Sequence, residues 1–395
     1  MALTLRPGSP EDVGMSSLRL RGVSDLVDGW VKDDNPHSMV VLVARKGVIV
    51  MHEAVGHLAP GKAGPPTLRD TIFELASITK VLTATAIVTL VEEGRVGLNR
   101  PVSTYIPEFV GEGKEGVLVR HLLTHTSGLR NEELEKYVGE NEGRARTPAS
   151  SSILHPLFGE RLALRYGCPL WKRPGEEMSY CDFNFDLVAD IVCRVTGVPF
   201  DRFAHDRIFR PLGMKDSFYC LVDAPRNRCV GYPPWTRDAM DEARETERFW
   251  MGCGCALSTA FDMAVFGQMF LNRGAYGGAR VLSPASVQAM TRNQIPGVKS
   301  TYHDQVFPEA AWGLGWCILA NKTGWNGGLQ SPRTYLHTGN GGAFVWIDPI
   351  AEIVGVYFSA TRFFASDADV TTPNWAKHWR NDLFADAVTA AITDH

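Results

Sequence analysis

The chain has 395 residues, of which 45% are hydrophobic and 21% are charged. A chain of this size and composition can bury a large core, either as one big domain or as two interleaved ones. The 40 basic and 44 acidic residues give a net charge of −4 without long blocks of like charge. This balance excludes the basic field that nucleic-acid binding requires, so we expect no nucleic-acid partner.

The first ten residues lack a basic segment followed by an apolar core, so the sequence predicts no signal peptide. No apolar run approaches the roughly 20 residues that are needed to cross a bilayer. We therefore expect a cytoplasmic protein with no membrane partner. In a chain without an export signal, the eight cysteines are expected to be free thiols, most of them buried.

A first β-hairpin is predicted within residues 38–51. Residues 39–43 are apolar, the turn residues Arg45, Lys46 and Gly47 follow, and residues 48–51 are apolar again. Two apolar runs of strand length on either side of a glycine turn indicate antiparallel strands.

Ser77 and Lys80 stand one turn apart where an uncharged apolar run, residues 81–91, begins. This spacing places a hydroxyl beside an amine on one face of a buried helix, which Gly94 closes. The positive end of the helix dipole and desolvation both disfavour a charged lysine. We therefore expect a lowered pKa for Lys80, which makes it a base for Ser77. Ser-x-x-Lys alone is a weak signal because it arises by chance about once in such a chain.

Two segments distant in the sequence carry polar residues that could act together with Ser77 and Lys80. Tyr180 lies at a loop-to-helix junction, two residues before Asp182, and the apolar run 183–195 follows. The second segment, residues 337–340, reads His-Thr-Gly-Asn and enters the strand-like residues 343–347. Both segments bring polar side chains to the ends of apolar elements, where a site can form.

Other predicted elements complete the chain. Residues 131–152 are polar and indicate an exposed loop. A second hairpin is predicted from residues 343–347 and 353–359, with a turn at Asp348 and Pro349. An amphipathic helix from Asn374 to about Thr393 is expected to follow it.

Ser-x-x-Lys, then Tyr-x-Asn, then Lys/His-Thr-Gly, in this order, is the pattern of the serine β-lactamase and penicillin-binding-protein superfamily, which this chain resembles. It looks most like the class C β-lactamases and the family VIII carboxylesterases. Supporting phrases fall between the motifs, such as His-Leu-Leu-Thr-His-Thr-Ser-Gly at 121–128 and Gly-Leu-Gly-Trp at 313–316. The resemblance covers nearly the whole chain, from about Pro10 to Ser359.

The predicted fold is α+β and β-lactamase/transpeptidase-like, an α/β sandwich with a central antiparallel sheet flanked by helices. Both chain ends, residues 1–100 and 286–395, are expected to build the sheet domain. Residues 101–285 are expected to form an inserted, mainly helical domain. The resemblance implies an active site in the cleft between the two, where Ser77, Tyr180 and His337 converge.

The resemblance implies a serine hydrolase that forms an acyl-enzyme on Ser77. Lys80 and Tyr180 would accept the proton of Ser77, and Tyr180 would protonate the leaving group. The backbone N–H groups of Ser77 and Asn340 would form the oxyanion hole. The residues expected to contact a small-molecule ester or amide substrate are Asp182, Trp316, His337, Thr338 and Gly339. We expect no metal ion and no other cofactor. His121 and His125 have helical spacing, but no glutamate completes a zinc motif.

Two residues depart from the lactamase pattern. Asp182 stands where that family carries asparagine, so an acceptor-only carboxylate replaces an amide that can donate to a substrate carbonyl. His337 stands where lysine is usual, so a largely neutral group replaces a fixed cation. Both changes favour neutral esters or small amides over penicillins and peptidoglycan peptides.

Ester hydrolysis of the family VIII kind is the first hypothesis. The second is amide-bond chemistry or acyl transfer at the same site, by a D-amino-acid peptidase, a lactam or oligoamide hydrolase, or an acyltransferase. The third is an idle homologue that binds a ligand, although intact Ser77, Lys80 and Tyr180 speak against it. The physiological substrate and the oligomeric state stay open at this point.

Overall fold

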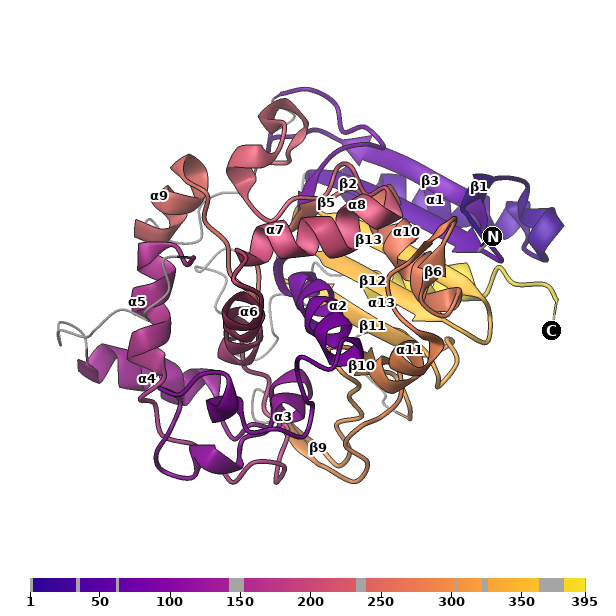
Figure 1. Ribbon diagram of the computed structural model, residues 1–395. Helices are drawn as coiled ribbons and strands as arrows, with labels where there is room; N and C mark the ends of the chain where they lie inside the picture. Colours follow the sequence, from indigo (N-terminus) through magenta and orange to yellow (C-terminus); the bar gives the residue numbers. More distant parts are fainter. Residues whose placement is uncertain are drawn as a thin grey trace.

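The structure is a computed structural model that describes residues 3–32, 36–61, 64–141, 153–231, 239–302, 305–321, 326–361 and 380–394. A β-sheet with its covering helices lies on one side of the molecule, and a mainly helical region lies on the other (Figure 1). The two chain ends lie close together beside the sheet. This arrangement confirms the predicted α+β fold.

The central sheet has seven strands in the order β1-β3-β2-β13-β12-β11-β10. Their bounds are β1 (Arg6–Pro7), β2 (Ser38–Arg45), β3 (Val48–Gly56), β10 (Cys317–Ile318), β11 (Tyr335–Gly339), β12 (Ala343–Asp348) and β13 (Ile353–Ser359). All neighbours are antiparallel except β1 and β3. Both predicted hairpins are confirmed, and the pairing of β2 with β13 joins them into one sheet.

Helices cover both faces of this sheet. Strand β2 is buried along its whole length, and its alternating side chains enter two separate hydrophobic clusters. Helices α1 (Ser17–Val31) and α13 (Asn381–Thr389) pack on one face. Helix α10 (Ala260–Leu271) packs on the other face, where Gly267 permits a close approach. A Cβ at Gly267 would lie 2.6 Å from Val354 Cγ1.

The helical region is organised around helices α2 (Thr79–Glu92) and α6 (Phe183–Thr196), which pack on each other. The other helices are α3 (Val119–Leu123), α4 (Asn131–Asn141), α5 (Pro156–Arg165), α7 (Phe200–Ala204), α8 (Arg210–Leu212), α9 (Ala239–Thr246) and α11 (Pro284–Met290). Short strands outside the central sheet are β4 (Phe73–Glu74), β5 (Leu257–Ser258), β6 (Ala275–Tyr276), β7 (Ala279–Arg280), β8 (Ser300–Tyr302) and β9 (Gln305–Phe307).

Helix α6 is largely buried, and its acidic residues are tolerated there because they have polar partners. Asp190 accepts a hydrogen bond from Tyr166 Oη at 2.6 Å and pairs with Arg194 at 2.9 Å. Asp186 accepts a hydrogen bond from the backbone N–H of Cys253 at 3.3 Å. Because buried carboxylates need such partners, these contacts fix the rotation of α6 against its neighbours.

Two expected elements differ from the structure. Residues 131–141 of the expected loop form helix α4. Leu134 is buried, and the two glutamates in the first turn interact favourably with the positive end of the helix dipole. Residues 142–152 lie outside the described residues. Helix α13 begins at Asn381, and the stretch 374–379 of the expected helix also lies outside them. Helix α10 falls within the expected insertion, yet it packs on the sheet.

None of the eight cysteines, all of which lie in the described ranges, forms a disulfide, and six of them are buried. Across the ranges that the structure describes, no helix has both the length and the apolar character needed to span a membrane.

Candidate active site

Ser77 lies in a single 3-10 turn, η2 (Ala76–Ile78), directly before helix α2. Strand β4, which leads to this turn, pairs with β5. The N–H of Leu75 continues the pairing by donating to Ala256 O at 2.8 Å. Ala76 has a φ of 44°, a left-handed conformation that non-glycine residues rarely adopt. Pairing with the segment around β5 therefore holds Ser77 in a bend that its own sequence does not favour.

Lys80 lies in the first turn of α2, with its side chain fully buried. Its Nζ donates to Ser77 Oγ and to Cys253 O, both at 2.9 Å. The third contact is an ion pair with Asp182 Oδ1 at 2.7 Å. An ammonium group has three N–H donors and no acceptor, so these three acceptors satisfy it completely. The arrangement is that of a protonated lysine.

The electrostatics of the pair agree with this geometry. Burial by itself would lower the pKa of Lys80, but the charge of Asp182, aided by Tyr180, outweighs it and raises the pKa above its ordinary value. Burial would likewise raise the pKa of Asp182, but the Lys80 ammonium holds it below its usual value. The predicted lowering of the Lys80 pKa is therefore wrong, because a carboxylate distant in the sequence is the closest charge to it.

Tyr180 completes the group around Ser77. Its ring lies against Lys80, with Nζ 4.9 Å from the ring centroid. Desolvation raises the pKa of Tyr180 to about 12, although the ammonium of Lys80 and hydrogen bonding with Lys80 and Ser77 oppose the rise. At neutral pH this side chain is therefore an uncharged phenol that can donate a proton.

His125 packs against the ring of Tyr180 and is a site residue that the sequence did not predict. The two rings stack with centroids 4.4 Å apart. His125 Nδ1 accepts a hydrogen bond from the N–H of Cys181 at 3.1 Å, and His125 O accepts one from the N–H of Ser179 at 2.9 Å. The sequence signal was its place in the His-Thr-Ser-Gly phrase. His121, four residues before His125, caps its own helix by accepting a hydrogen bond from the N–H of Leu118.

His337 lies on β11 on the other side of Tyr180, with ring centroids 6.3 Å apart. Its Nδ1 lies 2.8 Å from Thr338 O, so Nδ1 carries the proton and donates it to that carbonyl. Burial, followed by the charge of Lys80, lowers the pKa of His337 to about 3. The imidazole is therefore neutral at pH 7, as the sequence predicts.

The end of β11 lies directly against the turn that carries Ser77. A Cβ at Gly339 would lie only 2.2 Å from Leu75 O, so no other residue fits at this position. Thr338 is partly buried, and Asn340 is exposed in the turn that follows. The structure thus brings the His-Thr-Gly-Asn segment beside Ser77.

Trp316 is not brought to this site. Its indole is fully buried, at 5.2 Å from the ring of Phe270 and 5.3 Å from that of Tyr335. Trp316 is therefore a core residue and not the substrate contact that the sequence predicted. Trp312, four residues earlier, lies at the site instead, with its ring 5.9 Å from His337 and 6.1 Å from Tyr180.

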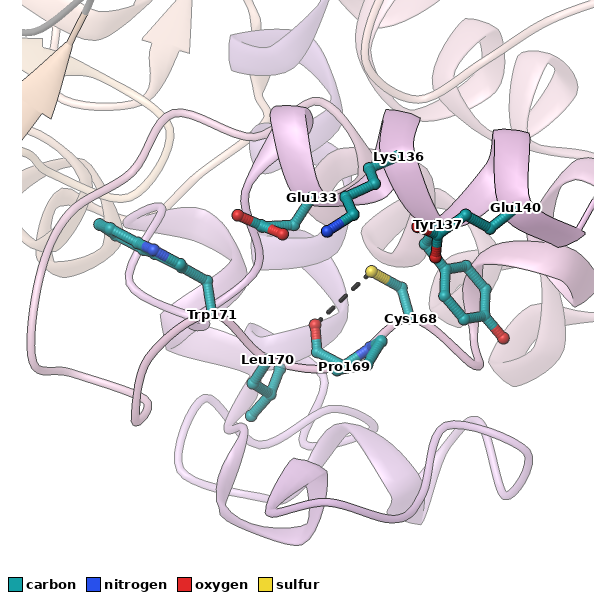
Figure 2. A pocket seen from close by; sticks show the side chains of 8 residues that line it. All are labelled: Glu133, Lys136, Tyr137, Glu140, Cys168, Pro169, Leu170 and Trp171. Carbon is teal, nitrogen blue, oxygen red and sulfur yellow. Dashed lines mark hydrogen bonds between the residues drawn. The ribbon is translucent and has the colours of Figure 1, made fainter.

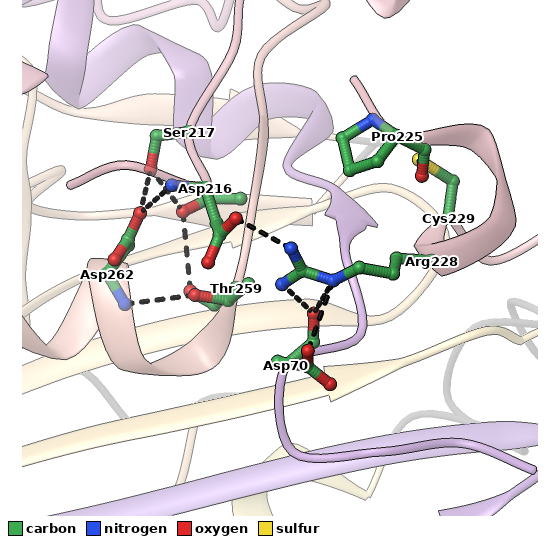
Figure 3. A network of polar contacts seen from close by, with 9 residues as sticks. Asp70, Asp216, Ser217, Pro225, Arg228, Cys229, Thr259 and Asp262 are labelled. Atoms are coloured by element: carbon green, nitrogen blue, oxygen red, sulfur yellow. Dashed lines mark hydrogen bonds and ion pairs between the residues drawn. The ribbon is translucent and has the colours of Figure 1, made fainter.

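A polar network that includes Asp216, Ser217 and Asp262 (Figure 3) holds Ser258 of strand β5. Asp262 Oδ2 accepts hydrogen bonds from the N–H of Asp216 at 2.8 Å and from Ser217 Oγ at 2.9 Å. Ser217 Oγ in turn lies 2.8 Å from Ser258 Oγ on β5. Burial raises the pKa of Asp262 to about 6. Through the pairing of β5 with β4, this network supports the turn that carries Ser77.

A cavity of about 250 Å³ lies between α4 and residues 168–171 (Figure 2). Figure 2 shows Trp171 and Tyr137 at its two ends, with Cys168 between them. Ser77, Lys80 and Tyr180 do not line it. It is linked to the site through α4, because Asn131 Oδ1, at the start of that helix, accepts a hydrogen bond from the N–H of Asp182 at 3.0 Å.

Asp201, Cys220 and Asp223 lie close enough together to share a metal ion, and they form the one such group found in the described ranges. Arg248 already pairs with both carboxylates of this group. A guanidinium therefore supplies the positive charge that a metal ion would bring.

The family model described as Beta-lactamase matches residues 23–378. The chain therefore belongs to the β-lactamase family of serine hydrolases, and the expected resemblance is confirmed. A Salmonella schwarzengrund protein, provisionally named D-alanyl-D-alanine carboxypeptidase, is 28% identical over 388 residues, which cover 88% of this chain and 83% of that protein.

Two solved structures have the same fold. EstCE1, described as a hydrolase with promiscuous acyltransferase activity, superposes with a TM-score of 0.73 at 20% identity, over 95% of this chain and 99% of its own. A family VIII carboxylesterase superposes with a TM-score of 0.68 at 20% identity, over 96% of this chain and 99% of its own. These relatives are named for different reactions.

Proposed function

We propose that this serine hydrolase is a carboxylesterase that cleaves small esters through an acyl-enzyme on Ser77. The observation that carries the proposal is the 2.7 Å ion pair between Lys80 and Asp182, beside a neutral His337. Penicillins and peptides that end in D-alanine bring a carboxylate, which needs a cation that faces the substrate. Lys80 is the one cation among the site residues described above, and it is buried and already paired.

Acylation begins with the proton of Ser77. At rest, Lys80 and Tyr180 both hold their protons, so one proton must leave this coupled pair before it can act as a base. The pair then takes the proton of Ser77, whose Oγ lies 2.9 Å from Lys80 Nζ, and Ser77 attacks the carbonyl carbon. Backbone N–H groups of Ser77 and Asn340 would bind the oxyanion, where one donor contributes about 3 kcal/mol.

Tyr180 would then protonate the leaving alkoxide. A phenol with a pKa of about 12 keeps its proton until a strongly basic leaving group demands it. The ionised pair next activates a water molecule, which attacks the acyl carbon and returns Ser77 to its resting state. Each acylation and deacylation cycle leaves Lys80 and Tyr180 with the same protons.

Amide hydrolysis is the second candidate, and the high pKa of Tyr180 is the observation that favours it. Without protonation an amide would have to expel a nitrogen anion, which is far more basic than an alkoxide or a phenolate, so its leaving group needs full protonation. The name of the Salmonella relative belongs to this class of reaction. Comparison of esters and amides of the same acid separates the two candidates.

The proposal is tested by the hydrolysis of p-nitrophenyl butyrate by wild type and Ser77→Ala at equal folded concentration. We expect Ser77→Ala to lose at least about a thousandfold in kcat, because the nucleophile cannot be replaced by water at the same place. Mass spectrometry of a rapidly quenched wild-type reaction should find one butyryl group on the peptide that contains Ser77.

Ser103→Ala, in a 3-10 turn outside the site, is the matched control and should keep wild-type turnover. Absence of turnover by the wild-type protein would overturn the esterase proposal. Equal turnover by wild type and Ser77→Ala would show that another group cleaves the ester.

A further inference from the structure

The ion pair of Lys80 and Asp182 is oriented with its negative end outward. The side chain of Lys80 is 0% exposed, whereas that of Asp182 is 42% exposed. Asp182 Oδ1 pairs with Lys80, while a large part of the Asp182 side chain stays accessible to a ligand. A substrate that approaches Ser77 therefore meets a carboxylate, with the compensating ammonium behind it.

The neighbouring ionisable groups do not cancel this charge at the surface. His125 and His337 are neutral, because burial lowers the pKa of each. Arg161, which also acts on Asp182, lies on α5 at 3.7 Å from the buried Asp186. The outward charge of Asp182 is thus available to a cation or to an N–H donor, and it repels a carboxylate.

Distances set which part of a substrate Asp182 can reach. The contacts of 2.9 Å and 2.7 Å that Lys80 Nζ makes put Asp182 Oδ1 no more than 5.6 Å from Ser77 Oγ. A carbonyl carbon in position for attack lies about 3 Å from the nucleophile. A substituent on the next carbon lies about 2.5 Å from that carbonyl carbon. Asp182 can therefore contact a group on the carbon adjacent to the scissile carbonyl.

We propose that Asp182 is a specificity-determining residue that selects acyl groups with an ammonium group on the carbon next to the carbonyl, so that α-amino acid esters are preferred substrates. This inference rests on the proposed function, since it names the acyl group that Ser77 takes. Asp182 offers the substrate only hydrogen-bond acceptors, whereas an asparagine at this position could also donate. The substrate must therefore supply the hydrogens.

A bound ammonium would also affect Lys80. It shares the carboxylate that otherwise stabilises the Lys80 ammonium, and it adds a like charge nearby. Both effects lower the pKa of Lys80 and release the base that acylation needs. A preferred substrate would thus gain in kcat as well as in binding.

The test compares alanine methyl ester with methyl isobutyrate at pH 7, in wild type and in Asp182→Asn. The two esters have the same shape, and the α-ammonium of alanine, which is mostly protonated at this pH, replaces a methyl group. The measured quantity is the ratio of kcat/KM for the two esters, for each enantiomer of alanine. Because one substrate pair is used throughout, their different intrinsic reactivities cancel between the two proteins.

We expect this ratio to fall about tenfold to a hundredfold in Asp182→Asn, the range of a charge-assisted hydrogen bond. Glu176→Gln, which removes an exposed carboxylate from the loop before Tyr180, should leave the ratio unchanged. If the ratio is the same in wild type and Asp182→Asn while isobutyrate is cleaved, the selection by Asp182 is refuted and the esterase remains. If wild type cleaves neither ester, the proposed function fails, and the inference fails with it.

A second measurement needs only the wild-type protein. Alaninamide and isobutyramide compete with p-nitrophenyl butyrate, and their inhibition constants are compared at pH 7. We expect the constant for one enantiomer of alaninamide to be at least about tenfold lower, and the difference to shrink as salt screens the charge. Equal constants for the charged and the uncharged amide would overturn the inference.

Discussion

The imidazole of His125 lies nearly parallel to the phenol ring of Tyr180, with ring centroids 4.4 Å apart and planes inclined by 27°. The same imidazole accepts a hydrogen bond from the N–H of Cys181, so His125 fixes both the ring of Tyr180 and the backbone after it. No contact joins His125 to Ser77 in the described hydrogen bonds, so its role is to position Tyr180.

Two substitutions of His125 separate its two contacts. His125→Asn removes the stacked ring, but it keeps an acceptor for Cys181 and tolerates the φ of 55°. We expect kcat for ethyl butyrate to fall about tenfold or more with a smaller change in KM, because a misplaced acid slows protonation. His125→Phe keeps a ring but leaves the Cys181 N–H without its partner, at a cost of about 1–3 kcal/mol in the free energy of unfolding. Wild-type kcat in a folded His125→Asn would contradict this role.

Tyr180→Phe tests the proton donor directly. Ethyl butyrate expels a strongly basic alkoxide, whereas p-nitrophenyl butyrate expels a phenolate that barely needs protonation. We expect the variant to lose about a hundredfold or more in kcat/KM on the ethyl ester and clearly less on the nitrophenyl ester. Equal losses on both substrates would exclude Tyr180 as the acid.

The ion pair between Lys80 and Asp182 predicts how activity depends on pH. Because Asp182 raises the pKa of Lys80, the base form becomes scarce at neutral pH, and kcat/KM for p-nitrophenyl butyrate should rise as the pH increases above 7. Asp182→Asn removes the raising charge, so the pKa of Lys80 falls and the rise in kcat/KM should move to lower pH. Profiles are corrected for spontaneous hydrolysis. An unchanged midpoint in the variant would mean that Lys80 is not the titrating group.

Asp262 predicts a pH-dependent stability term. Its pKa is about 6 in the folded protein and 3.8 ordinarily, so the folded state binds the proton more tightly. The contribution to the free energy of unfolding is full below about pH 4 and is lost as the pH rises through about 6. Asp262→Asn, whose amide oxygen can accept both hydrogen bonds, should therefore gain on wild type by about 2–3 kcal/mol between pH 4 and pH 7.

Urea unfolding at several pH values measures this difference. Asp25→Asn, on an exposed part of α1, is the control for the loss of one negative charge. A constant difference between Asp262→Asn and wild type over this pH range would refute the assignment.

Local sequence patterns were sufficient to predict much of the fold. The two apolar runs on either side of Gly47 predicted the first hairpin, and the uncharged run after Lys80 predicted α2. Helix α4 was not predicted because its sequence is mostly polar, and nothing in that sequence indicates that Leu134 is buried. Such burial depends on which neighbour packs against the helix, and a single sequence does not specify that neighbour.

The candidate site was predicted in its members but not in its electrostatics. Ser77, Lys80 and Tyr180 lie together as expected, and His337 is neutral as expected. The sequence placed Lys80 at a positive helix end, which lowers a lysine pKa, but the fold adds Asp182 at 2.7 Å. One charge at that distance outweighs a partial helix dipole, and only tertiary structure reveals it. The sequence also predicted Trp316 at the site in place of Trp312, because only tertiary structure shows which tryptophan reaches Tyr180.

The different exposure of the thiols allows chemical labelling to measure how often the structure opens. None of the eight cysteines forms a disulfide; six are buried, and Cys229 and Cys317 are partly exposed. A soluble aromatic disulfide added to the native protein therefore meets two thiols at once, and it reaches the other six only when the structure opens. The slow phase of labelling counts those openings without any optical signal from the protein. Comparison of that phase among the variants above would distinguish a loss of chemistry from a loosened fold in a single tube.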